Sequence, residues 1–119
     1  MYKRQVYVSQ AGCSFCARLE RDVLRPLQKV DALAAKVAII ELPWVDRAVV
    51  DFQGRAQATD TLLKDLGVAG APTLLFLDGQ GGALAPAIVG YQSPDFFWSY
   101  FETGIQRAHD ALVNSNAAR

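Results

Sequence analysis

The fold of this chain is decided by the stretch Cys13-Ser14-Phe15-Cys16. An apolar, strand-like segment (residues 6–8) precedes the stretch, and a helix-like segment (residues 17–30) follows it. Two thiols three positions apart at a strand-to-helix turn can form a disulfide across the first helical turn. Because they are the only two cysteines in the chain, we interpret them as a dithiol that cycles between reduced and oxidised forms.

Two other interpretations of the cysteine pair are open. One is a structural disulfide, but closing a loop of about four residues stabilises a fold by only about 1.9 kcal/mol, against ~3 kcal/mol for a fifteen-residue loop. The other is half of a metal site. A structural zinc site usually needs four Cys or His ligands, and besides the pair only His109, far along the chain, is available. We therefore expect no metal and a surface position for His109.

The composition predicts one globular domain. The chain has 119 residues, of which 51% are hydrophobic, enough to build a core. Twelve basic residues balance twelve acidic ones, so nucleic acid is not an expected partner. No apolar run approaches the length of a membrane span. We expect a single domain over residues 1–119, with a tail that frays at about residues 114–119.

Hydrophobic periodicity predicts seven main elements in the order β-α-β-α-β-β-α. The first half contains a strand Arg4–Ser9, a helix over 14–35 kinked at Pro26, and a strand over 36–42 covered on both faces. A helix over 59–66 follows, capped by Thr59 or Asp60 and ended by Gly67. The chain then forms a hairpin of strands Thr73–Leu77 and Ala83–Val89 and a helix from Ser93-Pro94 to about residue 113. Between the second strand and the second helix we expect a loop, with a short extended piece at residues 48–52. The first two strands should be parallel.

A sequence family matches these features. The Cys-x-x-Cys motif at a strand-to-helix turn, together with Gly67-Val68-Ala69-Gly70-Ala71-Pro72-Thr73 leading into an apolar strand, resembles the thioredoxin superfamily. The resemblance covers residues 6–113. It implies an α/β, thioredoxin-like fold with a four-stranded mixed sheet flanked by helices. It also implies thiol–disulfide oxidoreductase activity that needs no metal or organic cofactor.

The resemblance assigns roles to the two cysteines and to the proline segment. Cys13 should be the nucleophile, since the unpaired N–H groups and the positive dipole end of the following helix favour a thiolate. Cys16 should be more buried and should resolve the mixed disulfide formed by Cys13. Pro72 should follow a cis peptide bond and face the cysteines. The backbone of Ala71 would then be free to pair with a substrate strand.

Three further residues are candidates for the substrate surface. Ser14 and Phe15, the pair between the cysteines, should tune the reduction potential and pack beside the thiols. Trp44 follows the second strand, so it should lie at the same sheet edge as Cys13. We predict that Trp44 lines the substrate groove; packing as a cap on the core is the other interpretation.

The chain departs from thioredoxin at two points. Gly12 and the Ser-Phe pair replace the usual Trp-Cys-Gly-Pro-Cys, and Tyr7 stands where thioredoxin has a buried aspartate that aids proton transfer. Water or another carboxylate such as Glu41 would have to replace that aspartate. A finer resemblance is to SoxW-like periplasmic thioredoxins, on the Gly-Cys-x-x-Cys, the segment Asp51-Phe52-Gln53-Gly54 and the pair Gly90-Tyr91.

The predicted function is reduction or exchange of disulfides in protein substrates through Cys13 and Cys16. We expect a monomer. The finer resemblance implies a periplasmic protein that is reduced by a membrane electron donor. No signal peptide is visible, so a cytoplasmic protein is the alternative to a mature domain without its export signal. Two other functions stay open: a glutathione-dependent, glutaredoxin-like enzyme, although its expected Gly-Gly falls within the turn here as Gly81-Gly82, and a non-catalytic adaptor on the same fold.

Overall fold

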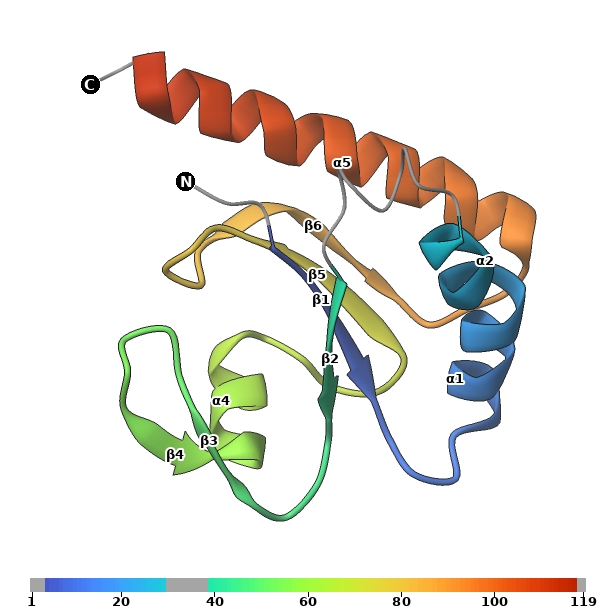
Figure 1. Cartoon of the computed structure of the whole chain (residues 1–119), viewed down its shortest axis with the longest axis horizontal. Coiled ribbons are helices and arrows are strands. Elements are labelled where there is room, and N and C mark those ends of the chain that lie inside the picture. Colours follow the sequence, from blue (N-terminus) through green and yellow to red (C-terminus); the bar gives the residue numbers. More distant parts are fainter. Residues whose placement is uncertain (1–3, 30–38, 118–119) are drawn as a thin grey trace.

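A computed structural model describes residues 4–29 and 39–117 of the chain. The elements are β1 (Arg4–Ser9), α1 (Ser14–Leu19), the π-helical turn η1 (Glu20–Leu24), α2 (Arg25–Gln28), β2 (Ile39–Pro43), β3 (Ala48–Val50), β4 (Ala56–Ala58), α4 (Thr59–Asp65), β5 (Thr73–Leu77), β6 (Ala83–Val89) and α5 (Pro94–Ala117). Figure 1 shows the strands of the main sheet between two sets of elements, α1, α2 and α5 on one side and α4 with the β3–β4 hairpin on the other.

The main sheet has four strands in the order β2-β1-β5-β6. Strand β1 runs parallel to β2 and antiparallel to β5, and β5 runs antiparallel to β6. The predicted mixed sheet and the parallel β1–β2 pair are therefore confirmed. All five residues of β5 are buried, as expected of a central strand with both faces covered.

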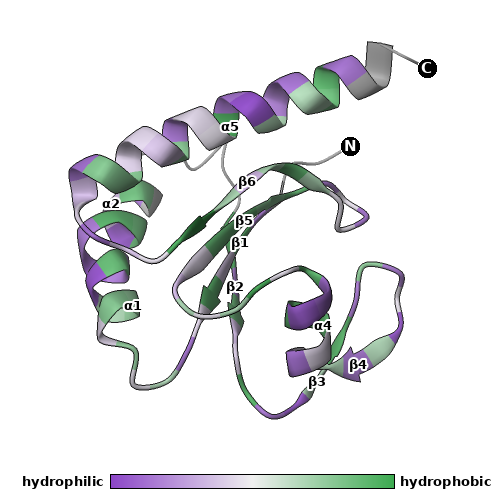
Figure 2. Cartoon of the chain, turned by 180° about the vertical axis from the view of Figure 1, so that it is seen from behind, coloured by the Kyte–Doolittle hydropathy of each residue, from purple (hydrophilic) through white to green (hydrophobic). Residues whose placement is uncertain are grey.

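Side chains that alternate along β1 and β5 build two cores, one on each face of the sheet. On the face toward α1 and α5, Tyr7 packs with Leu74 and Phe76. On the face toward α4, the core contains Val6, Val8, Leu63, Val68, Leu75 and Leu77. Figure 2 shows the result: the strands carry mainly hydrophobic residues, whereas α5 has both hydrophobic and hydrophilic surfaces.

The first helix is divided differently from the prediction. The chain forms α1, then the wider η1 turn, then α2, rather than one α-helix kinked at Pro26. In η1 the N–H of Arg25 bonds to the carbonyl of Glu20, five residues back. Pro26 explains the change, because it has no N–H to donate and its ring would clash with the carbonyl four residues earlier in an α-helix. The predicted helical residues 30–35 lie outside the described residues.

The prediction that β2 is covered on both faces was wrong, because none of its residues is fully buried. The strand lies at the edge of the sheet. Its only partner in the described sheet is β1, and Ile40 is 44% exposed. The strand also extends through Pro43, which lies opposite Ser9. Proline fits here because an edge strand can leave one side unpaired. The predicted strand residues 36–38 lie outside the described residues.

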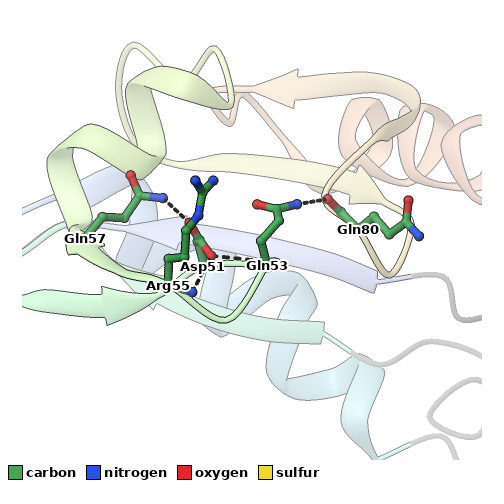
Figure 3. A network of polar contacts seen from close by, with 5 residues as sticks. All are labelled: Asp51, Gln53, Arg55, Gln57 and Gln80. Carbon is green, nitrogen blue, oxygen red and sulfur yellow. Dashed lines mark hydrogen bonds and ion pairs between the residues drawn. The ribbon is translucent and has the colours of Figure 1, made fainter.

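The segment predicted as a loop contains a second small sheet, the hairpin of β3 with β4. The buried carboxylate of Asp51 holds its turn: it accepts hydrogen bonds from the N–H groups of Gln53 (2.9 Å) and Arg55 (2.8 Å) and from the Gln57 amide (2.8 Å). The Gln53 amide in turn donates to the carbonyl of Gln80, which joins this turn to the β5–β6 hairpin (Figure 3). Only β3 was anticipated, because the Ala56–Ala58 sequence of β4 has no β-branched residue.

Helix α4 begins at the predicted residue, Thr59, but its N-cap differs from the predicted one. The N-cap is Ala58, with no side-chain capping bond, because the Thr59 hydroxyl donates to the carbonyl of Arg47 (2.9 Å) and Asp60 pairs with Lys64 (3.0 Å). Gly67 has φ +79°, which confirms the predicted left-handed residue after the helix.

Helix α5 begins at Pro94 as predicted, but continues to Ala117 rather than ending near residue 113. The fraying predicted for residues 114–119 stays a prediction. None of the helices in the described ranges is long and apolar enough to cross a membrane.

Candidate redox site

The turn between β1 and α1 places Cys13 at the start of a helix. Gly12 has φ +75°, a left-handed conformation that a residue with a side chain rarely adopts. Cys13 is the N-cap of α1, the position where Ser, Thr, Asp or Asn usually accepts from the first-turn N–H groups. Here the acceptor is sulfur: the N–H of Cys16 donates to Cys13 Sγ at 3.1 Å.

The two sulfurs lie at disulfide distance, with their Cα atoms 5.2 Å apart. Cys13 is partly exposed, whereas Cys16 is 2% exposed and belongs to the core between the sheet and α5. The sequence therefore predicted the relative burial correctly. An external disulfide can reach the first sulfur but not the second.

The proline segment faces the cysteine pair. The Ala71–Pro72 peptide bond is cis, and the carbonyl oxygen of Ala71 lies 3.8 Å from Cys13 Sγ. Pro72 is buried, and its own carbonyl accepts from the N–H of Gly90 at 2.8 Å. The antiparallel pairing of β1 with β5 brings these segments together, because Val8 lies opposite Thr73 and both chains continue from there into the site.

Beside the pair, an arginine lies between two aromatic rings. Ser14 and Phe15 are exposed, and the Arg18 guanidinium carbon lies 5.8 Å from the centre of the Phe15 ring and 5.9 Å from that of Tyr91. The Tyr91 hydroxyl donates to Asp22 at 2.8 Å. Burial, and then the bond to Asp22, raises the pKa of Tyr91 to about 12.

The sequence analysis missed Arg18. A signal was present, because residues three apart on a helix are neighbours and Arg18 follows Phe15 by three positions.

Trp44 lies at the predicted sheet edge but makes its contacts elsewhere. Its backbone N–H donates to the carbonyl of Ser9 (2.8 Å), so it follows β2 at the end where β1 leads to Cys13. Its indole N–H donates to Asp60 of α4 at 3.2 Å, and its side chain packs against the core on the α4 face. In the part of the chain that the structure describes, no hydrogen bond joins Trp44 to either cysteine, and its place in a substrate groove stays a prediction.

A second residue that sequence reasoning missed is Glu20, one helical turn after Cys16. The hydroxyl of Tyr7 lies 3.1 Å from Glu20 Oε2 and 3.4 Å from the carbonyl oxygen of Cys16. Burial, followed by the charge and hydrogen bond of Glu20, raises the pKa of Tyr7. Glu41 accepts a hydrogen bond from the Ser9 hydroxyl at 2.7 Å. A sequence signal for Glu20 was present, because Glu20 follows Cys16 by four positions and so lies on the same face of the helix.

The described residues hold no cluster of three or more His, Cys, Asp or Glu side chains suited to a metal ion. His109 is exposed on α5, as predicted. The site combines a dithiol that can be oxidised to a disulfide, the N-terminus of α1 and a cis-proline segment opposite the cysteines. This is the site of a thiol–disulfide oxidoreductase on a thioredoxin-like fold.

The comparisons with known proteins agree with this class. The family model for the thioredoxin-like domain matches residues 3–105, so the chain belongs to that family. No curated protein matches the chain. Among solved structures, the periplasmic thioredoxin SoxS from Paracoccus pantotrophus is 21% identical with a TM-score of 0.65, and the alignment covers 90% of this chain and 99% of SoxS.

Two further structures share the fold. A thioredoxin-fold protein from Helicobacter pylori is 20% identical with a TM-score of 0.64, over 91% of this chain and 72% of that one. Desulfothioredoxin from Desulfovibrio vulgaris Hildenborough is 24% identical with a TM-score of 0.54, over 87% and 82%.

Proposed function

We propose that this protein reduces disulfide bonds in protein substrates, with Cys13 as the nucleophile and Cys16 as the resolving cysteine. The observation that carries the proposal is the bond from the Cys16 N–H to Cys13 Sγ at 3.1 Å. A thiolate at this N-cap position would accept that N–H and face the positive end of α1, and both effects stabilise the charged form.

The reaction proceeds in two exchanges. The Cys13 thiolate attacks one sulfur of a substrate disulfide, which forms a Cys13–substrate mixed disulfide and releases the other substrate sulfur as a thiolate. Cys16, after losing its proton, attacks Cys13 Sγ, so the Cys13–Cys16 disulfide forms and the second substrate thiolate leaves. The two thiolates take up protons from water. The substrate gains two electrons and the cysteine pair loses two.

The surface around Cys13 fits an extended peptide. The Ala71 carbonyl at 3.8 Å from Cys13 Sγ is available for strand-like pairing beside the reacting sulfur. Exposed Ser14 and Phe15 would contact residues next to the substrate cysteine, with Phe15 51% exposed. Trp44, at the same sheet edge, would form the far wall of the groove.

The finer assignment is a periplasmic, SoxW-like monomeric domain that spans residues 1–119 and is re-reduced by a membrane electron donor. It is supported by the fold shared with SoxS, which is described as a periplasmic thioredoxin. A monomer fits strand β6, because Pro86 interrupts the donors of this edge strand and opposes pairing with a second chain. Cell fractionation with an antibody tests the compartment, and sedimentation tests the monomer.

The activity is tested by insulin reduction in the presence of a small dithiol. We expect wild-type protein to accelerate insulin precipitation, Cys13→Ser to abolish the acceleration and Cys16→Ser to accumulate a mixed disulfide. Ser99→Ala is the control, since it changes an exposed serine of α5 and leaves both thiols and the residues around them. Activity confined to glutathione mixed disulfides would favour the glutaredoxin-like function. Partner binding that survives both cysteine changes, without any reduction, would favour an adaptor.

A further inference from the structure

A small polar cleft lies between the first helical segments and the β1–β2 side of the sheet. Its volume is about 190 Å³, which is room for several water molecules. We call it the Glu20 cleft, and its lining residues are Tyr7, Glu20, Leu24, Arg25, Ile39 and Glu41. Glu41 and Arg25 are exposed, so the cleft reaches the protein surface.

Two groups from this cleft converge on the backbone of Cys16. Glu20 follows Cys16 by one helical turn, and its N–H bonds to the Cys16 carbonyl. The Tyr7 hydroxyl lies 3.4 Å from the same carbonyl and 3.1 Å from Glu20 Oε2. Since a hydroxyl has one hydrogen, and since bonds to a charged acceptor are the stronger ones, it donates to the Glu20 carboxylate.

Tyr7 cannot itself act as a base. Burial, then the charge of Glu20 and its hydrogen bond, and finally the charge of Glu41, raise the pKa of Tyr7. The phenol therefore keeps its proton throughout the neutral range. Tyr7 can fix the orientation of Glu20, but it offers no site for an additional proton.

The resolving step needs a proton acceptor. Cys16 attacks only as a thiolate, yet it is 2% exposed and packed among apolar residues, which disfavours the charged form. Bulk water has poor access to a side chain buried to this degree. The carboxylate placed one turn after Cys16, with a route to solvent through the cleft, is Glu20.

We propose that Glu20 accepts the proton that leaves the Cys16 thiol, and that Tyr7 is a positioning residue for the Glu20 carboxylate. This inference rests on the proposed function. As the Cys16 S–H bond breaks, its proton passes to Glu20, directly or through water in the cleft, and the sulfur electron pair forms the bond to Cys13 Sγ. The substrate thiolate leaves with the electrons of the mixed disulfide, and Glu20 then returns the proton to solvent.

Three other polar side chains face Glu20 across the cleft: Tyr7 from β1, Glu41 from β2 and Arg25 from α2. Glu41 is the matched comparison, because it is a carboxylate in the same cleft that lies beside Tyr7 in the strand register. Its Oε2 already accepts from the Ser9 hydroxyl at 2.7 Å, and it belongs to a different element from Cys16. Glu41→Gln therefore removes a charge from the cleft without removing the proposed acceptor.

The test separates the two exchanges in one stopped-flow trace. Reduced protein is mixed with the symmetric aromatic disulfide dithiobis-nitrobenzoate, which releases one coloured thiolate when Cys13 attacks and a second when Cys16 resolves the mixed disulfide. The traces are recorded from about pH 6 to 9.5 for wild type, Glu20→Gln, Glu41→Gln and Tyr7→Phe. The amide oxygen introduced by Glu20→Gln can still accept from Tyr7, so the substitution removes the base and keeps the hydrogen bond.

We expect Glu20→Gln to leave the first phase within about twofold of wild type and to slow the second about 100-fold at pH 6 to 7, the usual scale of general-base catalysis. The difference should narrow as the pH rises toward about 9.5, because the growing hydroxide concentration then removes the Cys16 proton without Glu20. Tyr7→Phe should slow the second phase less, and Glu41→Gln should match wild type.

Three results would overturn the proposal: an unchanged second phase in Glu20→Gln, an equal slowing by Glu41→Gln, or a slowing that is the same at every pH and so reports a structural change. In each of these the first phase persists, and the proposed oxidoreductase function stands. A wild-type protein that shows no first phase would instead remove the proposed function, and the role of Glu20 with it.

Discussion

Gly104 lies within α5, where the absence of a side chain lets the helix approach Phe76 of β5. A Cβ atom at position 104 would overlap the Cζ, Cε2 and Cε1 atoms of the Phe76 ring. Phe76 is 1% exposed, and its ring centre lies 6.2 Å from that of Phe101. The ring has little room to move away, because protein interiors are packed as densely as organic crystals. We therefore predict that Gly104→Ala destabilises the protein.

Two opposing effects set the magnitude. Helix propensity favours alanine over glycine by about 1 kcal/mol. An added carbon in a well-packed core costs about 1 to 3 kcal/mol. The cost exceeds the gain over most of this range, so Gly104→Ala should lower the free energy of unfolding by about 1 kcal/mol, which lowers Tm by about 4 °C in a chain of this length.

The assay is urea unfolding followed by circular dichroism, with Ser99→Ala as the control. Ser99 is exposed on the same helix, so this change should raise stability by a few tenths of a kcal/mol through propensity alone. In a Phe76→Leu background the clash is relieved, and Gly104→Ala should become neutral or stabilising. If Gly104→Ala stabilises the wild-type protein by about 1 kcal/mol, the close packing of α5 on Phe76 is wrong.

Three further predictions concern single side chains. Hydrogen bonds from the N–H groups of Arg55 and then Gln53 lower the pKa of Asp51, so the Asp51 carboxylate stabilises the fold above about pH 4 and this stabilisation is lost on further acidification. Asp51→Asn should therefore be less stable than wild type at pH 7 and should lose less stability in acid. Parallel acid titrations of the two proteins would contradict this. The Gln5 amide is fully buried with no hydrogen-bond partner among the described residues. Gln5→Met should therefore raise the free energy of unfolding by about 1 kcal/mol in urea titrations. A lower free energy of unfolding would mean that the amide has a partner. Trp44→Ala should lower kcat/KM for insulin reduction roughly fivefold, as expected for a contact worth about 1 kcal/mol in binding, whereas unchanged kinetics with reduced stability would limit Trp44 to packing.

The sequence predicted those parts of the fold that local pattern controls. Strands β1, β5 and β6 have the predicted bounds, because each has an apolar centre and is followed by turn residues. The position of Cys13 at a helix start and the approach of Ala71 also agree with the sequence, since a strand-to-helix turn and a proline before a central strand leave few arrangements.

The rest depended on contacts between distant residues. Strand β2 looks fully buried in sequence, but its place at the sheet edge follows from the order of strands in space. The β3–β4 hairpin is organised by a buried Asp51 carboxylate rather than by hydrophobic alternation. Glu20 reaches Tyr7 across thirteen positions of sequence, and nothing in the local pattern marks that pair.

The most direct measurement is the alkylation rate of Cys13 as a function of pH, in reduced protein carrying Cys16→Ala so that one thiol reacts. Removing the Cys16 side chain leaves its backbone N–H, which donates to Cys13 Sγ at 3.1 Å. If the start of α1 stabilises the thiolate, the rate should be half-maximal well below about pH 8.5, the ordinary thiol value. A rate that rises only near pH 8.5, as for an unperturbed cysteine, would contradict the activation of Cys13 by the helix.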